Sequence, residues 1–219
     1  MKMMRVLIIV FAAIMLVQCS KDKDDNGVNL TKGLLAVFKL NNEFNDSTGN
    51  IPITLYTNTG ITAVADRKGN AKSAMSFDEG YMYATVDGWS ANLITIACWV
   101  LPKNNTNDNF FLRADGAAFG FFQYKDAIGF TISTPATNTA KTSFGTGWIH
   151  LTGTYDGKDI RTYINGELAA TLNHPGEPGS VSKIEAGSFN SPYWKGAIDE
   201  LRFYNRLLSE EEIALLAKL

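Results

Sequence analysis

Residues 147–167 read GWIHLTGTYDGKDIRTYINGE, and this stretch indicates how the chain folds. Residues 148–155 and 160–164 are strand-like runs, rich in aromatic and β-branched residues. Asp156-Gly157 and Asn165-Gly166 separate these runs from each other and from a third run, 167–172. Both dipeptides favour the positive φ angles of type I′ hairpin turns. The stretch therefore predicts three consecutive antiparallel strands.

Strand-like runs recur along the whole chain at short spacing, with turn residues between them. A succession of short strands of this kind is typical of an all-β sandwich of two antiparallel sheets. We predict this fold for residues 33–219. The runs lie at residues 33–40, 74–77, 82–86, 94–101, 110–113, 120–124, 127–133, 148–155, 160–164, 167–172, 183–187 and 196–204.

One short helix is predicted at the C-terminal end. Ser209 is followed three residues later by Glu212, which is the spacing of a capping box. The apolar residues around it recur at helical spacing, so the helix has one apolar face. We expect this face to pack on the edge of the sandwich. Its members are Leu208, Ile213, Leu216 and Leu219.

The first 18 residues have the features of a secretory signal peptide. Lys2 and Arg5 precede an apolar run, 6–17, which is shorter than the roughly 20 residues needed to span a bilayer. Cys19 follows this run and resembles the acylated cysteine of a bacterial lipobox, although Gln18 replaces the usual small residue. We predict that Cys19 is lipidated. The alternative is ordinary secretion with an incidental cysteine.

Residues 19–32 are predicted to form a lipidated surface tether. The stretch 20–27 reads SKDKDDNG and contains no apolar residue, so it has nothing to bury. It resembles the export signal that sends Bacteroidetes lipoproteins to the outer face of the outer membrane. We therefore expect a cell-surface protein that contacts the membrane through its lipid anchor alone. The alternative is that the stretch is a plain linker.

Composition and cysteine content limit the function classes. The formal net charge of −2 gives no basic surface for nucleic acid. Cys98, the second of the two cysteines, lies in the apolar run ITIACWV and is expected to be a small buried core residue. If Cys19 is lipidated, no internal disulfide forms, and burial of the core must provide the stability.

From Leu34 onward the chain resembles the laminin-G-like, concanavalin A-like domains of secreted bacterial proteins. This resemblance implies a jelly-roll sandwich with relatives that hold sugars on the concave sheet. It also leaves function open, because the scaffold carries lectins, glycosidases and adhesion domains. Five segments in the family's order carry the likeness: 35–40 with 45–50, 74–78, 94–102, 147–166 and 195–209.

Glycosidase activity has little support in the sequence. Glycosidases of this superfamily place acidic residues at alternate positions of one strand, so that the carboxylates point together into the cleft. No Glu-x-Asp-x-Glu segment is present, and Asp78-Glu79 and Asp199-Glu200 would face opposite ways in a strand. His150 and His174 are expected to be structural. We therefore predict a protein that binds and does not catalyse.

Asp199 is the most informative carboxylate. Strict alternation along 196–204 places it on the same face as Ala197, Leu201 and Phe203, so it is expected to be buried among apolar residues. A buried carboxylate must be paired or bound to a cation. The resemblance implies a structural calcium ion held near Asp199, Asn41 and Asp78. Backbone N–H groups or an arginine are the alternative partners of Asp199.

Glycan binding needs exposed aromatic rings beside polar side chains. Trp99, Trp148 and Trp194 match family core positions, whereas four other residues are free to line a sugar site. Trp89 is expected in a loop, and Asn107 belongs to the Asn-rich loop 103–109. The alternative for each is loop packing or turn chemistry. The predicted carbohydrate-binding residues are Trp89, Tyr193, Tyr124 and Asn107.

Two functions follow from these observations. The first is a non-catalytic, carbohydrate-binding lipoprotein of the cell surface that helps to capture glycans. The second is a protein-interaction or adhesion domain without a sugar site. Exposed aromatic rings with polar neighbours on the concave sheet would favour the first, whereas a large flat apolar patch would favour the second.

Overall fold

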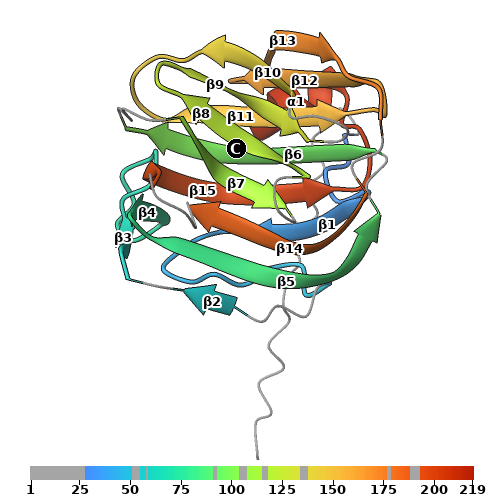
Figure 1. Cartoon of the computed structure of the whole chain (residues 1–219). Helices are drawn as coiled ribbons and strands as arrows, with labels where there is room; N and C mark the ends of the chain where they lie inside the picture. The colour runs from blue at the N-terminus through green and yellow to red at the C-terminus, as the bar shows by residue number, and fades with distance from the viewer. Residues whose placement is uncertain are drawn as a thin grey trace, which may run out of the picture.

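The computed structural model describes residues 28–50, 55–57, 59–103, 108–114, 118–133, 138–176, 179–187 and 193–219, except 91–92. The side chains of residues 55–57, 87–90 and 138 are also outside this description. The chain forms two antiparallel sheets stacked face to face, with one short helix behind them (Figure 1). The predicted all-β sandwich is therefore confirmed. Within the described residues, no helix is long and apolar enough to cross a membrane.

The sheets contain eight and seven strands. The eight-stranded sheet has the order β13-β12-β11-β6-β15-β4-β3, with β1 also paired to β15, and the seven-stranded sheet has the order β10-β9-β8-β7-β14-β5-β2. Both orders mix strands that are distant in sequence. The elements are β1 (Leu34–Phe38), β2 (Leu55–Thr57), β3 (Ile61–Val64), β4 (Ala74–Asp78), β5 (Tyr81–Ser90), β6 (Ile94–Pro102), β7 (Asn109–Ala114), β8 (Phe119–Tyr124), β9 (Ala127–Ile132), β10 (Asn138–Ser143), β11 (Ile149–Tyr155), β12 (Asp159–Ile164), β13 (Glu167–Asn173), β14 (Ser180–Gly187), β15 (Lys195–Tyr204) and α1 (Glu210–Leu216).

Strands β11, β12 and β13 form the predicted meander. Asn165 (φ 52°) and Gly166 (φ 89°) both have positive φ angles, as a type I′ turn requires. The first turn differs from the prediction, because only Gly157 (φ 88°) is left-handed there. Asp156 instead accepts hydrogen bonds on Oδ1 from the backbone N–H groups of Lys158 (2.9 Å) and Asp159 (2.6 Å). This Asx-type turn lengthens the connection to three residues, 156–158.

Aromatic side chains from both sheets fill the core between the layers. Phe111 stacks on Trp194 with ring centroids 4.9 Å apart, and the Trp194 indole N–H donates to Gln123 Oε1 at 2.7 Å. Cys98 lies in the same core, as predicted, and burial raises the pKa of its thiol. Burial of this apolar surface is the main stabilising term. The largest fully buried side chains include Trp194, Tyr155, Phe38, Phe77, Phe119, Phe121, Phe130 and Phe203.

A β-bulge in β15 overturns the predicted alternation along that strand. Asp199 pairs with Trp99 of β6, but the next pairing joins Arg202 to Ala97, so β15 contains one extra residue. Glu200 absorbs it with a φ of 48°. Before the bulge, Asp199 faces away from the core. After it, Leu201 and Phe203 face into the core. The prediction that Asp199 shares a face with Leu201 and Phe203 is therefore wrong.

Helix α1 covers the outer face of the eight-stranded sheet, that is, the face that points away from the other sheet. The capping box is confirmed, since Ser209 Oγ accepts from Glu212 N at 3.2 Å and the Glu212 carboxylate accepts from Ser209 N at 2.8 Å. The helix packs on strands β6, β12 and β15 and also contacts β13, the edge strand of this sheet, so the predicted packing on the edge is confirmed in part. A second apolar cluster fills this contact: Leu30, Ala97, Tyr163, Tyr204, Leu208, Ile213 and Leu216.

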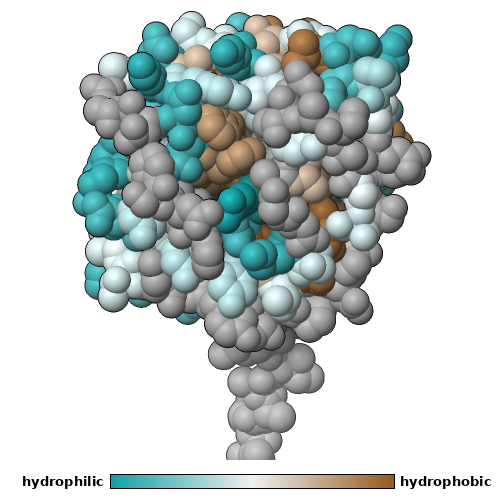
Figure 2. All heavy atoms as spheres, viewed as in Figure 1, coloured by the Kyte–Doolittle hydropathy of each residue, from teal (hydrophilic) through white to brown (hydrophobic). Residues whose placement is uncertain are grey.

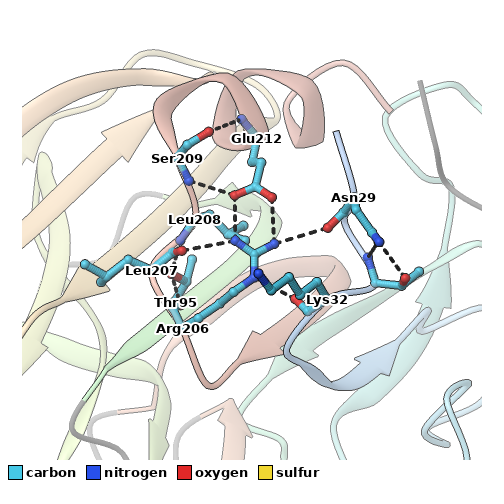
Figure 3. A network of polar contacts seen from close by, with 9 residues as sticks. Asn29, Lys32, Thr95, Arg206, Leu207, Leu208, Ser209 and Glu212 are labelled. Atoms are coloured by element: carbon cyan, nitrogen blue, oxygen red, sulfur yellow. Dashed lines mark hydrogen bonds and ion pairs between the residues drawn. The ribbon is translucent and has the colours of Figure 1, made fainter. Parts of the chain in front are cut away.

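Arg206 joins residues 28–32 to helix α1 (Figure 3). Its Nη1 and Nη2 each donate to one Glu212 oxygen at 2.6 Å. Nη2 also donates to the Asn29 carbonyl (3.2 Å), and Nε donates to the Lys32 carbonyl (2.6 Å). Leu30 is only 1% exposed beneath these contacts. Residues 28–32, predicted to belong to the tether, are therefore part of the folded domain.

Candidate functional site

One row of side chains crosses the outer face of the seven-stranded sheet. The pairing register aligns residues from six neighbouring strands, β10 to β5, in a line perpendicular to them. Their neighbours along each strand, such as Phe121, Phe130 and Ile184, face the core, so the row faces outward. The row consists of Thr139, Thr131, Gly120, Arg113, Glu185 and Tyr83.

Glu185 is the charged centre of this row. Its side chain is only 2% exposed and is bound by two cations. Arg113 donates from Nε to Oε2, and Lys183 Nζ lies 2.6 Å from Oε1. The two ion pairs offset the cost of burying the carboxylate. Lys183 Nζ also lies 5.4 Å from the centre of the Tyr83 ring, a cation–π distance that continues the contact into β5.

An aromatic cluster lies beside the charged row. The rings of Phe110 and Phe122 are 4.6 Å apart, and those of Phe122 and Tyr124 are 4.4 Å apart. Lys141 Nζ lies 4.6 Å from the centre of the Tyr124 ring, and the Tyr124 hydroxyl hydrogen-bonds to Thr139 Oγ1 at 2.8 Å. All three rings are half-buried. Figure 2 looks onto this face and shows a hydrophobic patch in a hollow, beside a hydrophilic one.

Two positions on this face are glycines and therefore carry no side chain. Gly120 lies between Arg113 and Thr131, and Gly129 lies between Phe122 and Lys141. A Cβ at Gly120 would meet Leu112 O at 2.1 Å, and a Cβ at Gly129 would meet Ala140 O at 2.3 Å. The neighbouring backbones are therefore too close for any other residue. Neither position therefore places a side chain between the cations and the rings.

Tyr124 is the predicted sugar-binding residue that the structure places in this site. Trp89 lies in β5 opposite Val181 and not in the predicted loop, and its side chain is outside the described residues. Tyr193 is 37% exposed just before β15, and no described contact joins it to the cluster. Asn107 lies outside the described residues.

Sequence reasoning missed the residues that form most of the site. Two signals were present in β7 and β8: Phe110 and Phe122 occupy positions that alternate with core residues, and Arg113 follows at an outward position. An aromatic side chain on the solvent side of a strand exposes apolar surface to water, which is unfavourable unless the ring contacts a ligand or a partner. The missed residues are Phe110, Arg113, Phe122, Lys141, Lys183 and Glu185.

Asp199 lies on the outer face of the other sheet, with an arginine as its partner. Arg67 Nη1 donates to Asp199 Oδ2 at 2.8 Å, and both side chains are less than 10% exposed. Burial, together with the nearby charge of Glu200, raises the pKa of Asp199 to about 7 in spite of Arg67. The arginine alternative considered for this carboxylate is the arrangement found.

The predicted calcium ligands are occupied by other partners. Asp78 pairs with Lys195 Nζ at 2.7 Å, about 13 Å along β15 from Asp199. The Asn41 side chain lies against the Ser73 and Lys39 carbonyls, where its amide is placed to donate. Cations bound to both carboxylates do not fit the oxygen shell that calcium prefers. Among the described residues, no group of three or more acidic, His or Cys side chains is placed to hold a metal. Structural calcium stays a prediction.

Trp99 and His150 also lie on this outer face. The register places Trp99 between Asp199 and His150, so the predicted core position of Trp99 is wrong. The Arg67 guanidinium carbon lies 4.5 Å from the Trp99 ring centre, and the Trp99 and His150 rings are 5.3 Å apart. Burial, with Arg202 and Arg67 nearby, lowers the pKa of His150 to about 3. Trp148 is half-buried before β11, whereas Trp194 is in the core as predicted.

The sequence profile of the Concanavalin A-like lectin/glucanases superfamily matches residues 77–214, more than half of the chain. The chain belongs to this superfamily. The match covers the strands that carry the outer-face residues of the seven-stranded sheet. No curated protein matches the sequence.

Similar solved structures are binding domains of bacterial toxins. The botulinum neurotoxin serotype D binding domain has 11% identity and a TM-score of 0.69, and it covers 85% of this chain. The binding domain of botulinum neurotoxin DC, solved in complex with SialylT, has 14% identity, a TM-score of 0.70 and 86% coverage. The binding domain of Paraclostridial Mosquitocidal Protein 1 has 17% identity, a TM-score of 0.71 and 86% coverage. This chain spans 51%, 51% and 52% of these three, respectively, and the likeness shows the fold.

Proposed function

We propose that this chain is a non-catalytic, glycan-binding protein of the cell surface. The sugar binds on the outer face of the seven-stranded sheet, at a site formed by Phe110, Phe122, Tyr124, Arg113 and Glu185. The observation that carries this proposal is the adjacency of half-buried aromatic rings to an ordered ion pair. Apolar lining with a few fixed polar groups is typical of small-molecule and sugar sites.

The two kinds of side chain have complementary roles. The faces of Phe122 and Tyr124 offer surface for the C–H groups of a pyranose ring, while Arg113 and Lys183 donate to its oxygens. Glu185 holds both cations in place, so little side-chain entropy is lost on binding. Membership of a superfamily with lectins, and the likeness to toxin binding domains, support a binding role.

The carboxylate geometry favours binding over hydrolysis. Glycosidases use two carboxyl groups about 5 to 9.5 Å apart on either side of the scissile bond. Among the described outward-facing side chains of the seven-stranded sheet, Glu185 is the only carboxylate, and both of its oxygens are held by cations. Neither oxygen is therefore free to reach a glycosidic oxygen.

The protein-interaction alternative has weaker support. It would need a contiguous exposed apolar patch of several hundred Å². The exposed large apolar side chains of the described residues come from four separate segments of the chain. They are Leu93, Leu168, Tyr193 and Leu219.

The N-terminal residues give the proposed location. We infer that Cys19 is acylated and that the protein stays on the outer membrane, facing outward. The folded domain begins by residue 28, since Val28 and Leu30 pack in the cluster beneath α1. Residues 20–27 would then form a short spacer between the lipid and the domain.

A glycan array tests the proposed function. A Cys19→Ser chain, which cannot be acylated, is screened with and without calcium. We expect a defined glycan hit whose affinity falls at least tenfold, about 1.4 kcal/mol, in Phe122→Ala. The matched control is Leu168→Ala, which removes an exposed apolar side chain from β13 of the other sheet. A folded protein that binds no glycan under either condition would overturn the proposal.

A further inference from the structure

We propose that the site selects acidic polysaccharides, with Arg113 binding the carboxylate of a sugar whose ring stacks on Phe122. This inference rests on the proposed glycan-binding function and names the class of glycan. Its support comes from the free edge of one guanidinium, the surplus of positive charge on the face and the spacing between cations and rings.

Arg113 presents an unused hydrogen-bonding edge. Its Nε donates to Glu185, and in the part of the chain that the structure describes it has no other partner. Nη1 and Nη2 therefore remain for a ligand, while the buried Glu185 fixes the plane of the guanidinium. The end-on edge of a planar guanidinium matches the two oxygens of a carboxylate. A neutral sugar forms weaker hydrogen bonds with this edge, because a hydroxyl oxygen carries no formal charge.

The charge of this face differs from that of the whole chain. Arg113, Lys141 and Lys183 are cationic, and Glu185 is the one acidic side chain among the described outward-facing residues of the sheet. The described side chains of this face thus carry a surplus of two positive charges, whereas the chain carries a formal net charge of −2. Clustered charge of one sign raises the local concentration of the opposite ligand. An anionic glycan fits this surplus.

The spacing fits a sugar ring between the guanidinium and the aromatic cluster. Gly120, which pairs with Arg113, and Phe122 are two residues apart on one face of β8, so their Cα atoms are separated by roughly 7 Å along the strand. Gly120 places no side chain between the guanidinium and the Phe122 ring. A ring stacked on Phe122 therefore directs one substituent toward Arg113.

A second cation lies farther along the same face. Lys141 is three strands from Arg113, at roughly 14 Å across the sheet. This span exceeds one sugar ring. A polymer with a carboxylate on every sugar reaches both cations, whereas a single acidic sugar reaches only one. We therefore expect the polymer to bind more tightly than its monomer.

Polygalacturonate and its methyl ester provide the direct test, because they share one backbone and differ in charge. Calorimetry with the Cys19→Ser chain is expected to show at least tenfold tighter binding to polygalacturonate than to the ester. Arg113→Lys keeps the charge but loses the planar edge, so it should reduce binding to polygalacturonate about tenfold and to the ester less than twofold. Lys141→Gln, on the outer side of Tyr124, should reduce binding to polygalacturonate several-fold and weaken its dependence on salt.

The outcomes separate this inference from the proposed function. Equal affinity for polygalacturonate and its ester, or equal loss of both in Arg113→Lys, overturns the inference but leaves glycan binding intact. Dextran sulfate is included as a second polyanion, and binding to it as tight as to polygalacturonate would show a general polyanion site and overturn carboxylate selection. A protein that binds no acidic and no neutral glycan refutes the proposed function itself. Circular dichroism on each variant shows that the fold is retained.

Discussion

The outer faces of the two sheets carry similar chemistry but are covered differently. On the eight-stranded sheet, Asp199, Trp99 and His150 form a row with Arg67 above it; on the seven-stranded sheet, Glu185 and Arg113 lie beside an aromatic cluster. Each face thus has a buried carboxylate paired with an arginine. The side chain of Arg67 is 8% exposed, whereas that of Arg113 is 20% exposed.

A second layer explains the difference. Helix α1 and residues 28–32 pack on the outer face of the eight-stranded sheet, and Arg67 comes from the connection between β3 and β4. The seven-stranded sheet has no such layer among the described residues, and its polar and apolar surfaces are visible in Figure 2. A polar row under such a layer stabilises the fold, whereas the row on the seven-stranded sheet, which has no such layer among the described residues, is the candidate site for a ligand.

The largest effect is expected from Arg67→Ala. This change leaves Asp199 buried without its cation, and breaking a buried pair costs about 3–5 kcal/mol. The loss is measured as the free energy of unfolding in urea at pH 8, above the raised pKa of Asp199 of about 7, so that the carboxylate is ionised in the wild type. Affinity for glycan should not change.

Arg113→Ala is the matched variant on the other face. Lys183 remains beside Glu185, so the expected loss of stability is only about 1–3 kcal/mol, while glycan binding is strongly reduced. If Arg113→Ala destabilised the protein as much as Arg67→Ala and left binding intact, the two faces would not differ in the way described.

The next largest effect is a pH dependence of the folding stability that arises from His150, on the outer face of the eight-stranded sheet. The unfolded chain binds a proton at His150 near pH 6.5, whereas the folded chain binds it near pH 3. Between these values the unfolded state holds more protons, so the His150 contribution to stability is lost as the pH falls. From pH 7 to 4.5 the loss is about 2–3 kcal/mol.

The His150→Gln variant isolates this contribution. Asp199, on the far side of Trp99, acts in the opposite direction, because its raised pKa makes the folded state bind the extra proton between about pH 4 and 7. Arg67 and Arg202 stay charged throughout. The difference in unfolding free energy between the wild type and His150→Gln should therefore fall with decreasing pH. A difference independent of pH would show that His150 titrates normally.

The sequence predicts the architecture because local signals and tertiary structure agree. Strand-like runs become strands, Asn165-Gly166 forms the expected turn, and Ser209 caps the helix. The position of α1 was predicted only in part, because its apolar face fits an edge or the outer face of a sheet equally well. Only the fold shows that Tyr163 and Tyr204 offer an apolar surface on the outer face.

Asp199 shows how one residue limits such reasoning. Strict alternation needs an unbroken ladder, and the extra residue at Glu200 reverses the face of every residue on one side of it. No glycine or proline marks this bulge, since Glu200 itself takes the positive φ. The identity of the buried partner, Arg67, is also nonlocal, because 132 residues separate it from Asp199.

The binding face was predictable only in part. Tyr124 was predicted as a site residue from its aromatic ring, but the rest of the candidate site is formed by register across β10, β9, β8, β7 and β14. Arg113 and Glu185 are 72 residues apart and are brought together by the pairing of β7 with β14. Pairing of this kind is not encoded in any local pattern, so the charged centre becomes visible only in the structure.

Ser209→Ala gives the smallest expected effect and tests whether α1 is an independent cover. The alanine removes the hydroxyl that accepts from Glu212 N, and loss of such a cap costs about 1 kcal/mol. The Arg206–Glu212 pair still holds the helix to residues 29 and 32, so unfolding in urea should shift modestly while glycan affinity is unchanged. Ser209→Thr keeps the cap and should behave like the wild type. Reduced glycan affinity in Ser209→Ala alone would mean that the covered face and the binding face are coupled through the core, and that the layer on one sheet sets the geometry of the other.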